Sequence, residues 1–203
     1  NKYGVDALRL WMYTVNNPGD SKNFDEKTVD EIVKKVFNPI INILAFYELY
    51  KNDSVLVSDK STNILDKWII SRLNELLKKG TDSLEKYQVF DSARLIRDFV
   101  NDFSTWYIRR SRDRFKSENI KEKKEALSTT KFVMLELVKY MAPFVPFATE
   151  DIYQKIKTVK DSESVHLCSW PEIKDFDVKL IDDMQKARNI VTQALELRQK
   201  SGH

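Results

Sequence analysis

The chain has 203 residues, of which 42% are apolar and 32% charged, and it contains only four glycines and five prolines. So few turn-forming residues exclude an all-β sandwich or barrel and favour long helices with few connections, and the charged fraction is typical of amphipathic helices with ionic outer faces. The 34 basic and 31 acidic residues nearly cancel, so any nucleic-acid surface depends on where the charges lie.

The cysteine content and the ends of the sequence bear on compartment and completeness. Cys168 is the only cysteine, which excludes an internal disulfide and indicates a reducing, cytoplasmic compartment. No apolar run approaches the roughly 20 residues that cross a bilayer, so no membrane partner is expected. The sequence starts at Asn1 without Met and opens inside what looks like structured sequence. We therefore expect a fragment of a longer protein.

Apolar side chains at three- and four-residue steps predict a series of amphipathic helices. In chain order these cover residues 5–15, 23–50, 65–87, 91–116, 122–141, 148–156 and 180–197. Residues 23–26 supply a capping side chain and acidic residues for the start of the second helix, and Asp91 or Ser92 caps the fourth. Pro39 predicts a kink or break within the second. Polar residues 16–20 and 51–63 are expected to be a break and a loop.

The sequence changes character after the sixth predicted helix. Residues 164–170 alternate like an extended strand, and Pro171 closes it. The predicted fold is therefore mainly all-α, an antiparallel helix bundle with a short extended segment and a trailing helix that runs to His203. We expect the chain to divide into residues 1–22, a bundle over 23–160, and a final part over 161–203.

The strongest functional candidate is the basic segment at the end of the fourth predicted helix. Residues 109–124 contain eight basic and three acidic side chains. The candidates for RNA binding are Arg109, Arg110, Arg112, Arg114 and Lys116. Arginines one turn apart on neighbouring helix faces suit the phosphates of an RNA stem. Composition alone favours a solvated face with some arginines bridging to acidic neighbours, and we expect one or two of the four arginines to be structural.

Two aromatic residues precede these arginines. Trp106 and Tyr107 could stack on an unpaired base. Adjacent helical positions point about 100° apart, so the two side chains are not expected to serve the same function. Trp106 continues the stripe of Phe99 and Phe103, which favours a place in the core. Tyr107 continues Val100 and Phe103, with its hydroxyl free to reach a partner.

The sequence offers little for catalysis or metal binding. His166 and Cys168 can share one side of a strand, but without further ligands nearby a metal site is not expected. No nucleophile–base pair, carboxylate dyad or glycine-rich phosphate loop is apparent, so no cofactor is expected.

Five segments resemble class I aminoacyl-tRNA synthetases, in the family's order and spacing. They are residues 3–10 (Tyr-Gly-Val-Asp-Ala-Leu-Arg-Leu), 66–74 (Asp-Lys-Trp-Ile-Ile-Ser-Arg-Leu-Asn), 101–115, 142–150 (Ala-Pro-Phe-Val-Pro-Phe-Ala-Thr-Glu) and 164–171 (Ser-Val-His-Leu-Cys-Ser-Trp-Pro). Within the third, Trp-Tyr-Ile-Arg-Arg-Ser-Arg-Asp-Arg-Phe resembles the isoleucine enzymes rather than the valine enzymes, which tend to follow Trp-Tyr with acidic or neutral residues.

The resemblance implies the anticodon-binding helix bundle of an isoleucyl-tRNA synthetase, with tRNA(Ile) and the catalytic domain of the same protein as partners, and no DNA. Residues 1–22 would then be the remnant of the segment that follows the catalytic domain. The signatures His-Ile-Gly-His and Lys-Met-Ser-Lys-Ser, which serve ATP and its Mg²⁺ in the parent enzyme, are absent, so the fragment is expected to be non-catalytic. The alternatives are the same module of a valine or leucine enzyme, and a helical protein-interaction scaffold without an RNA role.

Overall fold

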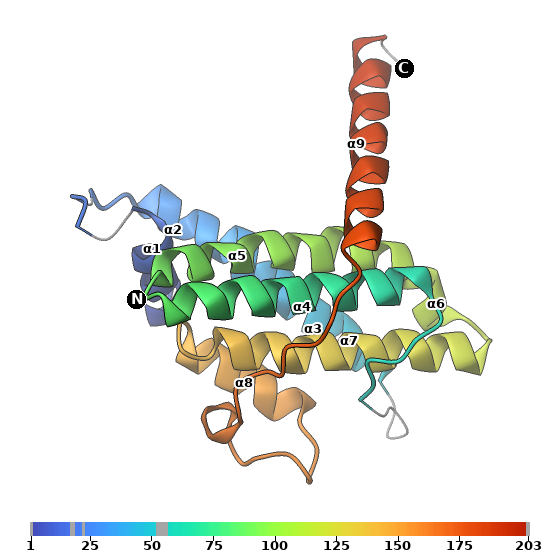
Figure 1. The fold of residues 1–203 in the computed structure, drawn as a ribbon, viewed down its shortest axis with the longest axis horizontal. Coiled ribbons are helices and arrows are strands. Elements are labelled where there is room, and N and C mark those ends of the chain that lie inside the picture. The colour runs from blue at the N-terminus through green and yellow to red at the C-terminus, as the bar shows by residue number, and fades with distance from the viewer. Residues whose placement is uncertain (1, 17–18, 22, 52–56, 202–203) are drawn as a thin grey trace.

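The computed structural model describes residues 2–16, 19–21, 23–51 and 57–201, and these fold into an all-α bundle (Figure 1). The α-helices are α1 (Val5–Thr14), α2 (Glu26–Ile32), α3 (Asn38–Tyr50), α4 (Ile64–Glu85), α5 (Val89–Asn101), α6 (Arg109–Lys116), α7 (Ile120–Met141), α8 (Pro146–Ile156) and α9 (Val178–Lys200). Two π-helical turns, η1 (Val33–Phe37) and η2 (Asp102–Ile108), and a 3₁₀ turn, η3 (Val165–Leu167), complete the described elements.

Two of the helices are longer than these divisions suggest. The residues that flank η1 and η2 all have right-handed helical dihedral angles. Residues 26–50 and 89–116 therefore each form one continuous helix with a π turn inside it. Of the kink or break expected at Pro39, the break does not occur, because the wider turn just before it relieves the crowding between its ring and the preceding carbonyl.

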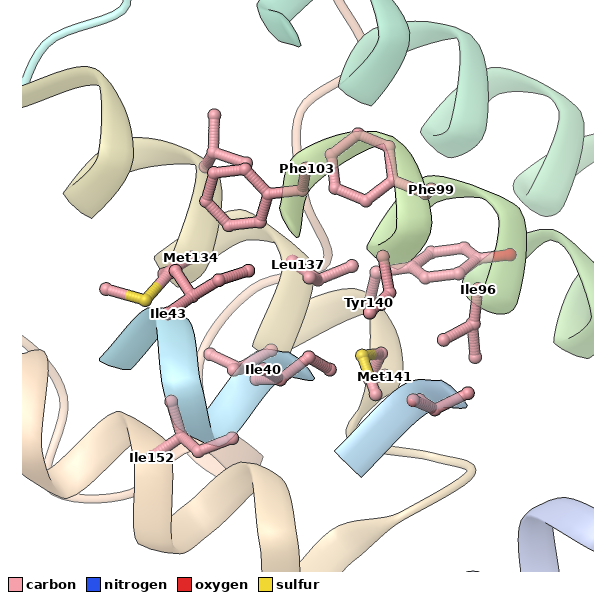
Figure 2. Packing of buried hydrophobic residues seen from close by; sticks show 14 of the residues in the cluster. Ile40, Ile43, Ile96, Phe99, Phe103, Met134, Leu137, Tyr140, Met141 and Ile152 are labelled. Carbon is pink, nitrogen blue, oxygen red and sulfur yellow. The ribbon is translucent and has the colours of Figure 1, made fainter. Parts of the chain in front are cut away.

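Part of the core lies where α3, α5, η2, α7 and α8 meet, as Figure 2 shows for labelled residues such as Ile40 and Ile152. Buried residues of α4, among them Trp68 and Ile69, belong to the same cluster. Amphipathic spacing turns one face of each helix inward, and burial of these apolar faces stabilises the bundle. Gly80, near the C-terminal end of α4, is explained by packing: a Cβ atom there would overlap the hydroxyl group of Tyr140 on α7. Tyr140 in turn donates a hydrogen bond to the Ser92 carbonyl at 2.9 Å.

The C-terminal part is extended and then helical. The chain after α8 runs along the bundle, and α9 projects from it (Figure 1). Residues 164–170 contain the 3₁₀ turn and no strand among the described residues, which corrects the predicted strand. The apolar residues of this segment pack without forming a strand. Val165 is buried, and Trp170 donates its Nε1–H to Thr81 Oγ1 at 2.9 Å.

The helix boundaries lie within three residues of the predicted ones, and one predicted cap is wrong. The capping side chain expected among residues 23–26 is that of Asp25, which accepts from the Lys27 amide at 2.9 Å. The fourth predicted helix instead begins at Val89 after Gln88, without a side-chain cap, because Ser92 is buried and bonded to Tyr140. The predicted break 16–20 and loop 51–63 lie partly outside the described residues, and His203 lies wholly outside them.

Candidate nucleic-acid interface

The basic segment forms the end of the continuous helix 89–116. Its buried side is carried by Phe103, Tyr107, Ser111 and Phe115, at steps of four residues. In a regular α-helix each such step overshoots a full turn by about 40°. The π turn η2 rotates less per residue than an α-helix, so it offsets part of this drift and keeps these side chains on one face.

The two aromatic residues before the arginines differ in burial. Tyr107 is fully buried at 0% exposure, its ring stacked near Phe103 at 5.8 Å between centroids. Trp106, expected in the core, is only half-buried. Tyr107, named as a candidate for stacking on a base, cannot do so in this fold, because no face of its ring is open to a ligand. Its hydroxyl does reach a partner, but inside the protein.

That partner is Asp66 in the first turn of α4, a carboxylate with 0% exposure. Its Oδ1 accepts from the Tyr107 hydroxyl at 2.8 Å and from Arg114 Nη1 at 2.6 Å. Its Oδ2 accepts from Arg114 Nη2 at 2.8 Å and from the Ser61 hydroxyl at 2.6 Å. The Arg114–Asp66 pair is thus bidentate, the strongest geometry for these groups. It ties the end of α6 to the start of α4.

The electrostatics of this buried network follow from its geometry. Burial raises the pKa of Tyr107 well above its ordinary value, and the Asp66 carboxylate raises it further. Burial alone would lower the pKa of Arg114, but the bond to Asp66 outweighs it and raises that pKa. The Nε atom of Arg114 is also buried. Arg114 therefore has no free edge for a phosphate, which corrects its assignment to an RNA-contacting set.

The other four cations of residues 109–116 face solvent. Arg109, Arg110, Arg112 and Lys116 are all exposed, and we call them the α6 surface. None of them forms an ion pair within the part of the chain that the structure describes. Unpaired guanidinium groups on a helix can bind an anionic backbone without first breaking an internal pair.

Trp106 links the α6 surface to α9. The guanidinium carbon of Arg110 lies 4.4 Å from the centroid of the indole, and that of Arg188, on α9, lies 5.0 Å from it. Arg188 also pairs with Asp102 through Nη1 at 2.7 Å, and Arg72 of α4 pairs with the same carboxylate through Nε at 3.0 Å. Asp102 therefore joins three helical segments beneath Trp106, whose ring is shared by two cations.

The structure thus divides the seven predicted site residues. It brings together Arg109, Arg110, Arg112 and Lys116 on the surface, with Trp106 beside Arg110, and it places Arg114 and Tyr107 in the interior. Sequence reasoning missed the two carboxylates that organise this region, Asp66 and Asp102. Helical spacing gave a partial signal for Asp66, since it shares the side of α4 that carries buried Ile69 and Leu73.

Two other expectations concern metals and membranes. Among the described residues no group of three His, Cys, Asp or Glu side chains is placed to hold a metal ion. Cys168 instead lies 3.2 Å from the Tyr153 hydroxyl. No described helix is both long enough and apolar enough to cross a bilayer.

The fold and this site define an all-α bundle with a basic helix end, and comparison with known proteins identifies its class. A family model described as the anticodon-binding domain of tRNA ligase matches residues 66–202. The chain belongs to this family. The leucyl enzyme (LeuRS) of Agrobacterium radiobacter K84, in a ternary complex with tRNA and LeuAMS, shares the fold with a TM-score of 0.61 at 17% identity, over 89% of this chain and 20% of that one.

Similar curated proteins include isoleucine–tRNA ligases. That of Clostridium novyi is 38% identical over 189 residues, which cover 89% of this chain and 18% of the relative. That of Chlamydia trachomatis serovar L2 is 36% identical over 206 residues, covering 98% and 20%. The chain therefore spans about a fifth of the length of the relatives it matches.

Proposed function

We propose that this chain is the tRNA-binding helical module of an isoleucine–tRNA ligase and that the α6 surface contacts the tRNA backbone. The observation that carries the proposal is the set of four exposed cations without ion-pair partners among described residues, on a member of this family. Phosphate contacts supply affinity and register but little sequence information.

The finer assignments rest on the relatives. Isoleucine is favoured over valine and leucine because the similar curated proteins at 35–38% identity are isoleucine enzymes. The parent would join isoleucine to tRNA(Ile) with ATP and Mg²⁺ in the cytoplasm, and this chain would contribute binding without catalysis. The division into residues 1–22, 23–160 and 161–203 belongs to the same proposal. The leucine and valine enzymes remain the alternative parents, and the family match argues against a scaffold without an RNA role.

The experiment measures tRNA(Ile) binding by fluorescence anisotropy over a series of salt concentrations. It compares the unsubstituted chain with the variant Arg109→Gln/Arg112→Gln/Lys116→Gln. Each lost phosphate contact should reduce the slope of log affinity against log salt by about one. The triple variant should therefore bind roughly ten- to a hundredfold more weakly at about 0.15 M salt. Because the contacts are to phosphates, tRNA(Val) and tRNA(Leu) should lose affinity by the same factor.

The matched control is Lys78→Gln/Lys155→Gln/Lys186→Gln. It removes the same charge from three exposed lysines on α4, α8 and α9, each of which pairs with a nearby aspartate on its own helix. An equal loss of affinity in this control would refute the α6 surface as the contact, as would binding that ignores salt. Comparison of the affinities of the unsubstituted chain for the three tRNAs tests whether the parent enzyme is the isoleucine enzyme.

A further inference from the structure

The two π turns of the bundle border a hollow that is separate from the α6 surface. Eight side chains line it: Lys34, Lys35, Pro39, Arg97, Asp98, Asn101, Ser104 and Thr105. Its volume is about 490 Å³. The lysines come from η1, and the two hydroxyl groups come from η2. Since π turns are rare and often occur at functional sites, two of them bordering one hollow suggest a function for it.

The chemistry of the hollow suits an anion. Three of its lining residues are cations and one, Asp98, is a carboxylate. Arg97 is exposed and forms no ion pair with any described residue. Lys34 and Lys35 pair with Asp30 at 2.5 Å and Glu31 at 2.7 Å, but these are exposed pairs within one helix. Such pairs are weak, so an incoming phosphate can compete for both lysines.

The hollow is continuous with the α6 surface along the helix 89–116. Asn101, Thr105 and Arg109 are all exposed and follow one another at four-residue steps. The buried residues Phe103 and Tyr107 show that such steps stay on one side of this helix through η2. Arg97 and Arg109 are separated by twelve residues, about 18 Å of helix. An RNA backbone lying along this side would meet cations at both ends and hydroxyl and amide groups between them.

We propose that the hollow between η1 and η2 binds a phosphate of the same RNA, as a second contact point that extends the α6 surface. The proposal rests on the proposed function, because it takes the RNA as the source of the phosphate. Arg97 donates to the phosphate oxygens, and Lys34 and Lys35 supply charge from the opposite wall. Ser104, whose hydroxyl has no hydrogen-bond partner among described residues, is free to donate to the same group.

The first test measures tRNA(Ile) binding by the full chain carrying Arg97→Gln or Lys34→Gln/Lys35→Gln, by fluorescence anisotropy across a salt series. We expect Arg97→Gln to weaken binding about three- to tenfold and to lower the salt slope by about one. The control, Lys155→Gln, removes an exposed lysine that pairs with Asp151 on α8. Binding by Arg97→Gln that matches this control overturns the hollow as a site.

The second test locates the RNA directly. Cys168 is the only cysteine, so Cys168→Ser/Ser104→Cys carries one thiol, at the hollow, for a photo-crosslinking reagent. We expect this variant to crosslink to tRNA(Ile), and Cys168→Ser/Lys155→Cys not to do so. Absence of crosslinking at position 104 overturns the proposal. Failure of the hollow alone leaves the α6 variants weakened, whereas failure of the proposed function leaves every variant equal to its control.

Discussion

Arg110 and Arg114 stand one turn apart on α6, yet the first lies on the surface over Trp106 and the second is enclosed by Asp66. The side chain of Arg114 is 13% exposed, and that of Asp66 is 0% exposed. The difference comes from α4, because it brings a carboxylate to one arginine and none to the other. Within one basic segment, a partner 48 residues away in sequence separates a structural arginine from a surface one.

The substitution Asp66→Ala tests this difference between Arg110 and Arg114 most directly, and we expect it to have the largest effect. It leaves the Arg114 guanidinium buried without its partner and removes the acceptor of the Tyr107 hydroxyl. Breaking a buried pair from one side should lower the free energy of unfolding by about 3–5 kcal/mol. Urea unfolding followed by circular dichroism measures this loss. An unchanged stability together with lost tRNA affinity would return Arg114 to the RNA-contacting set.

Asp102→Ala extends the comparison to α9. The substitution removes the carboxylate that holds both Arg72 and Arg188. Hydrogen bonds to charged groups contribute about 1.5–3 kcal/mol, and we expect a loss of about 2 kcal/mol. Hydrogen exchange should become faster in α9, whose described residues include none that is fully buried. The control Lys186→Gln, on the same helix, should leave exchange unchanged. Equal exchange in both variants would show that Asp102 does not anchor α9.

The buried network should also fail at alkaline pH. The pKa of Tyr107 is raised in the folded chain, so above about pH 10 the unfolded chain loses a proton that the folded chain keeps. The stability that this difference supplies is complete below pH 10 and is lost as pH rises, by about 1.4 kcal/mol per pH unit. The Tyr107→Phe variant should therefore lose less stability than the unsubstituted chain between pH 10 and 11. Tyr87→Phe, at a residue 90% exposed, should behave like the parent.

The continuous helix 89–116 shows how much of the structure could be predicted from the sequence. Apolar spacing predicted the bundle and most helix ends, because burial of one face is written in local periodicity. The same spacing was right for Tyr107, which is buried with its hydroxyl bonded to Asp66. It was wrong for Trp106, which is only half-buried, since a change of helical pitch has no local signal in apolar spacing. Whether Arg114 is buried or exposed depends on its ion pair with Asp66. A pair between two helices cannot be predicted from the sequence of either helix alone. Sequence alone did anticipate that one or two of the arginines are structural.

The finest test of the comparison uses two neighbours on α6, Arg112→Gln and Arg114→Gln. Arg112 is exposed and has no ion pair among described residues, so its loss should change the unfolding free energy by less than about 0.5 kcal/mol. It should nevertheless weaken tRNA(Ile) binding about threefold and lower the salt slope by about one. Arg114→Gln should do the reverse, with a large loss of stability and an unchanged salt slope for the folded chain. If both variants lowered the slope equally, the arginine held by Asp66 would be exchanging its carboxylate for a phosphate, and the interior and surface of this helix would form one binding site.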